Sequence, residues 1–384
     1  MTEMAPSPSQ ATICADLRAW IRDDAGVTGP VGGFMGLDLD TLPKPPRSLL
    51  HHWVGDAPVA LGFHNIRSAL VHLIKARAPN GTVWLPAYTC PSLPAALEAH
   101  GIAIAYYPIT PDLAVAADAF NAVDAHDALV LMNYFGKPAV LGTALDCVPK
   151  DCLVIEDGAH TIETGKPAQA PWRLYSARKM VGVPDGGLLV GYKSAAASSA
   201  PMPDLGPDLA PAFKPLQNIS FMSPVIARGE DPAARFNGQW YADYQDAEAN
   251  ALIGDYPISR LSAALLTRID AQMVIKRRHQ NYRTLAEALS THALWPEDLT
   301  PDWVPFCFPI LVPDAARFVA GMADLGVFVP RYWAHSPAPQ DNPEFSTAHD
   351  LAQRLVGLPC DHRYEAAAMH RVIDAVHQTL PPSR

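Results

Sequence analysis

One lysine in this sequence stands among residues that could do chemistry together. Lys179 lies in RLYSARKMVGVPDGGLLVG, residues 173–191, with Ser176 and Arg178 close by and a Gly-Gly pair a few residues later. The hydroxyl, the guanidinium and the glycine-rich backbone could hold a phosphate. The lysine amine, if neutral at working pH, could form a Schiff base with an aldehyde. The segment therefore suggests a ligand that carries both an aldehyde and a phosphate.

A carboxylate precedes this lysine by 22 residues, because Asp157 lies near the end of the apolar stretch CLVIEDGAH, residues 152–160. Pyridoxal phosphate has an aldehyde, a phosphate and a pyridine nitrogen, and an acidic partner that keeps the nitrogen protonated makes the ring a better electron sink. Taken singly, either motif is more often structural, since acidic residues cap helices and lysines face solvent. Their order and spacing predict a pyridoxal phosphate site with Lys179 and Asp157 as catalytic residues.

The elements around these motifs alternate between strands and helices. Apolar patterns predict helices at 68–78 and 92–101 and strands at 82–88, 102–109, 127–135 and 152–159. Such alternation predicts a mainly parallel sheet covered on both faces, and these sheets bind ligands beyond the carboxyl ends of their strands. Asp157 comes at such an end.

The second half of the chain has a different organisation. A Pro-rich crossover at 194–215, with residues 239–241 as part of a lid, precedes one long amphipathic helix over 259–289. The segments 304–312, 315–326, 327–333 and 365–380 then predict the strands and helices of a small α+β domain. We expect an N-terminal segment at 1–54, a large cofactor-binding α/β domain at 55–258, and the long helix with the small domain at 259–384.

The composition is typical of a large globular protein, and its net negative charge does not favour binding to polyanions. The chain has 384 residues, 49% of them apolar, and 39 acidic against 29 basic residues give a net charge of −10. This charge predicts no nucleic-acid and no membrane partner. The start has no signal-like pattern, so we expect a soluble cytoplasmic protein. The six cysteines form no CxxC pair, which predicts no metal site.

Further motifs join the first two in one ordered set. They are EDGAH at 156–160, SARK at 176–179, DGG at 185–187, LPAYTCPSLPAALEAHG at 85–101, NYFGKP at 133–138, RRHQNYRTLAEAL at 277–289 and LVGLPCDHRY at 355–364. Together they resemble the pyridoxal-phosphate-dependent sugar aminotransferases of the DegT or StrS type, within the aspartate aminotransferase fold. The resemblance covers about residues 55–380.

The resemblance implies a fold and a set of cofactor contacts. The implied fold is α/β, the fold type I of PLP-dependent transferases, with a mainly parallel seven-stranded sheet sandwiched by helices and a smaller α+β C-terminal domain. Lys179 would form the Schiff base and then move a proton at the substrate carbon, and Asp157 would hold the pyridine nitrogen protonated. The implied cofactor-binding residues are Gly62, Phe63, His64, Tyr88, Cys90, Asp157, Ala159, His160, Ser176 and Lys179.

Within that set, the phosphate and the ring have separate partners. Ser176 and the backbone N–H groups of the turn at 62–64 would bind the phosphate. Ala159 would lie under one face of the ring, and His160 would hydrogen-bond near its phenolic oxygen.

Three positions depart from the family pattern. Phe63 stands where many relatives have a hydroxyl residue. Cys90 stands where they stack an aromatic ring on the cofactor, a role that Tyr88 could fill. Asp255 lies in the region from which relatives extend an Asn to the neighbouring subunit's phosphate. A carboxylate would repel that phosphate, so Asp255 should have another role.

The implied activity moves an amino group from glutamate to a nucleotide-linked keto-sugar. Both substrates are small molecules, and the resemblance implies a homodimer with shared active sites. Arg331, Tyr332 and Trp333 are the candidate substrate residues. Two alternatives remain open: a PLP enzyme of this fold that acts on a non-sugar ketone or dehydrates a sugar, and a non-catalytic regulatory relative. Lys179 argues against the dehydratase branch, in which a histidine replaces the lysine.

Overall fold

The computed structural model describes residues 31–32, 45–162, 169–192, 248, 250–298 and 301–380. Cys14, the Pro-rich crossover at 194–215 and residues 239–241 lie outside these ranges. The elements are β1 (Val31–Gly32), α2 (Leu49–Val54), β2 (Val59–Phe63), α3 (Ile66–Arg77), β3 (Val83–Pro86), α4 (Ser92–Glu98), β4 (Ile104–Tyr107), β5 (Ala128–Met132), β6 (Leu153–Gly158), β7 (Trp172–Ser176), α5 (Ala177–Met180), β8 (Gly187–Gly191), α9 (Arg260–Leu266), α10 (Ala271–Leu289), β9 (Cys307–Leu311), α11 (Ala315–Asp324), β10 (Val327–Phe328), α12 (Ser346–Arg354), β11 (Leu355–Pro359) and α13 (Ala366–Thr379), with short 3-10 turns η1 (Tyr134–Gly136), η2 (Ala144–Cys147), η4 (Ser290–His292) and η5 (Pro343–Phe345).

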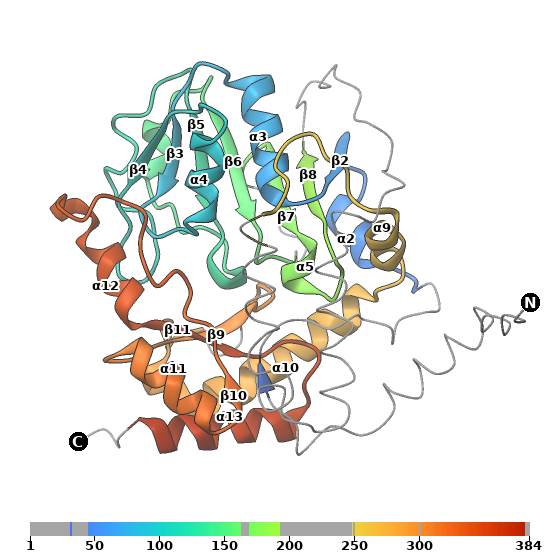
Figure 1. Cartoon of the computed structure of the whole chain (residues 1–384), viewed down its shortest axis with the longest axis vertical. Helices are drawn as coiled ribbons and strands as arrows, with labels where there is room; N and C mark the ends of the chain where they lie inside the picture. The colour runs from blue at the N-terminus through green and yellow to red at the C-terminus, as the bar shows by residue number, and fades with distance from the viewer. Residues whose placement is uncertain are drawn as a thin grey trace, which may run out of the picture.

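Seven strands form one sheet in the order β2-β8-β7-β6-β5-β3-β4 (Figure 1). Strand β8 is antiparallel to both β2 and β7, and the other neighbouring pairs are parallel. Every residue of β5, β7 and β8 is buried, as expected where helices cover both faces of a sheet. The expected mainly parallel seven-stranded sheet is confirmed.

Two apolar layers cover the sheet because successive side chains of a strand point to opposite faces. On one side, Val130 of β5 belongs to a cluster with the buried residues of α3 and α4. On the other side, Leu129 and Leu131 belong to a cluster with residues of α10, β9 and α13. This second cluster runs without a break from the sheet into the C-terminal elements. The domain boundary at residue 258 stays a prediction.

The prediction of a single helix over 259–289 was wrong, because the segment forms two helices. Helix α9 ends at Leu266 and α10 begins at Ala271. The carboxylate of Asp270 accepts the amides of Gln272 at 2.8 Å and Met273 at 3.4 Å, which caps the second helix at its N-terminus. The chain therefore turns before α10, which runs between the sheet and helices α11 and α13 in Figure 1.

The C-terminal elements follow the predicted order with two differences. The strand expected over 327–333 is only the two residues of β10, which pair with β1 in parallel. Helix α12 and strand β11, which we had not predicted as separate elements, precede α13, and β11 pairs with β9 antiparallel. Because β10 is short, residues 329–333 form a loop, and this loop lies at the candidate site.

Candidate active site

The two predicted catalytic residues lie at the same edge of the sheet. Strands β6 and β7 are parallel, with Gly158 opposite Tyr175, so their carboxyl ends meet. Asp157 is the next-to-last residue of β6, and Lys179 lies in α5, directly after β7. The Nζ atom of Lys179 lies 3.4 Å from Nε2 of His160. The sequence motifs thus bring one amine, one imidazole and one carboxylate together.

Asp157 is a buried carboxylate that is short of positive charge. Its Oδ1 accepts the amide of Ala159 at 2.9 Å. Burial raises the pKa of Asp157 above its ordinary value, although Lys179 and the Ala159 amide act in the opposite direction. A protonated ring nitrogen would supply the missing charge, so this carboxylate fits the role predicted for it in pyridoxal phosphate binding.

His160 is enclosed by aromatic rings. Its ring stacks on Phe306 with 4.1 Å between centroids and 3° between planes, and Trp333 lies parallel at 6.0 Å. Burial lowers the pKa of His160 well below its ordinary value, and the charges of Lys179 and Arg278 lower it further. The imidazole is therefore neutral at physiological pH, and it can accept a hydrogen bond from the Lys179 ammonium.

Six aromatic residues form what we call the aromatic wall. They are Tyr88, Tyr134, Phe135, Phe306, Tyr332 and Trp333. The hydroxyl of Tyr88 donates to the Tyr332 carbonyl, and that of Tyr134 donates to the Tyr88 carbonyl. Phe135 and Trp333 have φ values of +52° and +50°, a conformation that costs energy in bulky residues and persists only where the surroundings impose it. The wall is therefore a rigid, apolar side of the site.

The predicted substrate residues separate into two groups. Tyr332 and Trp333 belong to the aromatic wall. The guanidinium of Arg331 instead donates to the Ala352 carbonyl at 2.9 and 3.1 Å and to Gln353 at 2.9 Å, which ties its loop to the end of α12. The hydrogen bonds of Arg331 thus hold its loop against α12.

Cys90 and Tyr88, the two candidates for the ring contact, differ in their surroundings. The Sγ atom of Cys90 is half-buried and lies 3.1 Å from the hydroxyl of Ser92. Tyr88 is fully buried in the aromatic wall. Which of them touches a bound ring stays a prediction.

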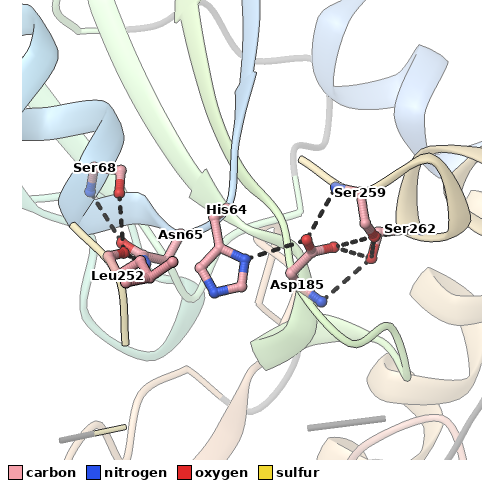
Figure 2. A network of polar contacts seen from close by, with 7 residues as sticks. All are labelled: His64, Asn65, Ser68, Asp185, Leu252, Ser259 and Ser262. Carbon is pink, nitrogen blue, oxygen red and sulfur yellow. Dashed lines mark hydrogen bonds and ion pairs between the residues drawn. The ribbon is translucent and has the colours of Figure 1, made fainter. Parts of the chain in front are cut away.

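The turn between β2 and α3 is held by a polar network, which Figure 2 shows. Nδ1 of His64 lies 3.2 Å from Asp185, the acidic residue of the DGG motif. Asp185 also accepts the amide and hydroxyl of Ser259 at 2.9 and 2.7 Å and the hydroxyl of Ser262. The network joins the turn, the loop after α5 and the start of α9.

One of the phosphate donors expected in that turn, the amide of His64, needs a correction. The amide of His64 donates to the Tyr256 carbonyl at 2.8 Å, so this N–H already has a partner. Gly62 serves close packing, because a Cβ there would lie 2.6 Å from the side chain of Ile258. Phe63 is fully buried in β2. The amides without a partner inside α3 come slightly later, in its first turn.

Three charged residues that we had not predicted as a group meet beside Lys179. Arg178 donates to the carboxylate of Glu248, and Nη2 of Arg67 lies 3.6 Å from the same carboxylate. The sequence suggested only Arg178, as a phosphate ligand. Arg67 and Glu248 were not predicted, because Arg67 fits an ordinary helical pattern and Glu248 is distant in sequence. Ser176 is buried at the start of α5.

Asp255 has a different partner, as its charge suggested. Its Oδ1 lies 2.8 Å from Nδ1 of His72 on α3. Within the described ranges, no three His, Cys, Asp or Glu residues are grouped so that they could hold a metal ion. The described helices include none that is both long and apolar enough to cross a membrane.

Comparisons with known proteins show which solved structures have a similar fold. No family model matches the chain, and no curated protein matches it in sequence. Solved structures do match. DesV of S. venezuelae, solved with a ketimine intermediate, gives a TM-score of 0.61 at 16% identity over 96% of this chain and 95% of DesV. A DegT DnrJ EryC1 StrS aminotransferase from Brucella abortus gives 0.61 at 16% identity over 96% of both chains.

A third match is a putative sugar aminotransferase, Spr1654 of Streptococcus pneumoniae, in its PMP form. It gives a TM-score of 0.60 at 13% identity over 97% of both chains. Similarity over nearly the whole of all three proteins shows that this chain has the fold of these aminotransferases.

Proposed function

We propose that this protein is a pyridoxal-phosphate-dependent aminotransferase that transfers an amino group from glutamate to a nucleotide-linked keto-sugar. The observation that carries the proposal is Lys179 beside neutral His160 and a buried, charge-deficient Asp157 at the carboxyl ends of β6 and β7. Spr1654, a putative sugar aminotransferase of similar fold, supports the sugar acceptor.

The chain's residues divide the work at this site. Bound there, pyridoxal phosphate would supply an electron sink for the amino carbon of the substrate. Asp157 would hold the ring nitrogen, and Ser176 the phosphate. Lys179 would carry a proton between substrate carbon and cofactor carbon, helped by His160, which can accept a hydrogen bond without adding charge. The aromatic wall would exclude water, and its Trp333 would contact the acceptor.

The half-reaction with the donor tests this proposal directly. Protein loaded with pyridoxal phosphate should convert glutamate to a stoichiometric amount of 2-oxoglutarate and lose the visible absorbance of the bound aldehyde. Keto-sugar nucleotides, screened one by one, should restore that absorbance when the correct acceptor is added. Restoration only by a non-sugar ketone, or dehydration of a sugar, would favour the alternative activity. A chain that binds no cofactor would be the regulatory relative.

We also propose a homodimer whose active sites are shared. Leu252 and Tyr256 are 41% and 43% exposed on the segment before α9, which gives that segment apolar surface for a second copy. Mixing Lys179→Ala with Tyr256→Asp should rebuild one complete site in the heterodimer. Activity that stays absent, with the heterodimer confirmed by mass, would mean that each subunit's site is self-contained.

A further inference from the structure

Three charged side chains from distant parts of the sequence converge beside Lys179. Arg67 comes from the first turn of α3, Arg178 from α5, and Glu248 from a separate segment. Arg178 donates to Oε1 of Glu248. Arg67 places Nη2 3.6 Å from Oε2 and donates from Nη1 to the Glu248 carbonyl at 3.5 Å. Two guanidinium groups therefore face one carboxylate.

Within the part of the chain that the structure describes, three cationic side chains act on this carboxylate. The charges of Arg178, Arg67 and Lys179 all act to lower the pKa of Glu248. Burial acts to raise the pKa of Glu248, yet Arg178 and Arg67 hold it below its ordinary value. A carboxylate offers two oxygens and one charge to these cations. A phosphate monoester offers three oxygens and up to two charges, so it would satisfy them more fully.

The backbone adds donors at the same place. In helix α3, which has 12 residues, the Asn65 side chain caps only the amide of Ser68, at 2.9 Å. The amides of Ile66 and Arg67 have no partner inside the helix, and the helix dipole favours an anion at this end. Arg67 is 7% exposed, so its charge acts in a largely dehydrated setting.

We propose that Arg67 and Arg178 bind the phosphate of the cofactor and that the Glu248 carboxylate competes with this phosphate for the two guanidinium groups. The inference rests on the proposed function and deepens it. The arginines would replace the turn hydroxyl that Phe63 cannot supply. Glu248 would keep the arginines paired before the cofactor enters, and its ion pairs would have to break on loading.

The test compares pyridoxal phosphate with pyridoxal, which lacks the phosphate. Dissociation constants of both are measured on the full chain from the visible absorbance of the bound aldehyde. Arg67→Gln should weaken pyridoxal phosphate by about tenfold or more, since a charge-assisted contact is lost, and should leave pyridoxal unchanged. Glu248→Gln should strengthen pyridoxal phosphate severalfold and also leave pyridoxal unchanged. A misfolded variant cannot show this gain.

Arg354→Gln is the matched control, because Arg354 pairs with Asp350 at 3.0 Å on the surface of α12. Equal weakening of both aldehydes in Arg67→Gln, or no gain in Glu248→Gln, would overturn the inference while leaving the proposed function intact. Weaker uridine diphosphate binding to the loaded Arg67→Gln protein, with unchanged cofactor affinity, would assign the arginines to the substrate and also overturn it. Wild-type protein that binds neither aldehyde would remove the proposed function itself.

Discussion

Two carboxylates near Lys179, the buried Asp157 and the partly buried Glu248, have pKa values that shift in opposite directions. Burial raises the pKa of Asp157, and the charge of Lys179 with one backbone amide does not cancel the effect. Burial also acts to raise the pKa of Glu248, but two guanidinium groups reverse the result. Lys179 acts on both carboxylates, so the difference lies in the two guanidinium groups beside Glu248 and in the deeper burial of Asp157.

This contrast gives the site two unlike ends. The Asp157 end lacks positive charge and lies beside the aromatic wall, where burial also keeps His160 neutral. At the Glu248 end, among the described residues, two guanidinium groups lie against one carboxylate. A ligand with a protonable ring nitrogen at one side and a phosphate at the other would complement both ends, and pyridoxal phosphate has this arrangement.

The largest expected effect comes from removal of Lys179, whose charge acts on both carboxylates. Lys179→Ala should lower turnover by about 10²–10⁴-fold or more, because the base at the substrate carbon is lost. Borohydride reduction followed by peptide mapping should then find no cofactor attached to the chain. Lys137→Ala, which breaks a lysine–carboxylate pair with Asp298 at 2.7 Å, is the matched control and should keep activity. Persistent covalent attachment in Lys179→Ala would contradict the assignment.

The two carboxylates should separate in kinetics. Asp157→Asn should keep much of the cofactor bound but slow single-turnover deamination of glutamate by about a hundredfold or more, because a neutral pyridine is a poorer electron sink. Glu248→Gln, measured at saturating cofactor, should slow that rate far less, because its proposed role lies at the phosphate and not at the ring nitrogen. Equal effects of the two substitutions would remove the distinction between the ends of the site.

Arg278 on α10 links α5 to the segment just before β9, and we expect this link to stabilise the folded protein. It is fully buried on α10 and donates to the carbonyls of Met180 at 2.8 Å and of Pro305 and Phe306 at 3.0 Å. Arg278→Met leaves these oxygens without their donor and should lower the free energy of unfolding by about 3 kcal/mol. Denaturant unfolding measures the change.

The neighbouring residue provides the control for that substitution. Arg277 lies on the same helix but pairs at 3.3 Å with Glu365, which is largely exposed. Arg277→Met should cost at most about 0.5 kcal/mol. Similar losses for both variants would mean that the carbonyl contacts of Arg278 contribute little.

The sheet side of the site could be predicted because its signals are local. Asp157, His160 and Lys179 lie on two short motifs at the ends of adjacent strands, and the parallel pattern alone brings such ends together. Even the break before α10 had a local signal, since Asp270 precedes an apolar run as N-cap residues do, although the continuous helical periodicity concealed it.

The opposite side could not be predicted from the sequence in the same way. Phe306 stacks on His160 from a segment more than a hundred residues later, and no periodicity states which rings will meet. Arg67 fits the helical pattern of α3 whether or not its guanidinium meets a distant carboxylate. Arg331 seemed suited to a substrate by its type and position, and only the three-dimensional structure gives it the Ala352 carbonyl as partner.

The smallest predicted effect concerns pH and the neutral state of His160. In the folded protein its pKa lies well below 6.5, because burial, Lys179 and Arg278 disfavour the charged ring, whereas in the unfolded chain it titrates near 6.5. As pH falls through that value, only the unfolded chain gains this proton, so stability falls. Asp157 acts oppositely, since its raised pKa lets the folded protein take up a proton first.

The His160 contribution can be isolated with a variant that keeps the aromatic ring. Between about pH 7.5 and about pH 5.5, burial of neutral His160 should cost the wild-type protein about 1 kcal/mol of unfolding free energy. His160→Phe preserves the stacking on Phe306 but cannot titrate, so its loss over this range should be smaller by that amount. All other groups, Asp157 included, remain in both proteins, and the difference between the two pH profiles therefore reports the one ring. Parallel profiles would mean that His160 takes up its proton in the folded state as readily as in the unfolded chain, and the apolar end of the site would then be less dehydrated than its aromatic contacts indicate.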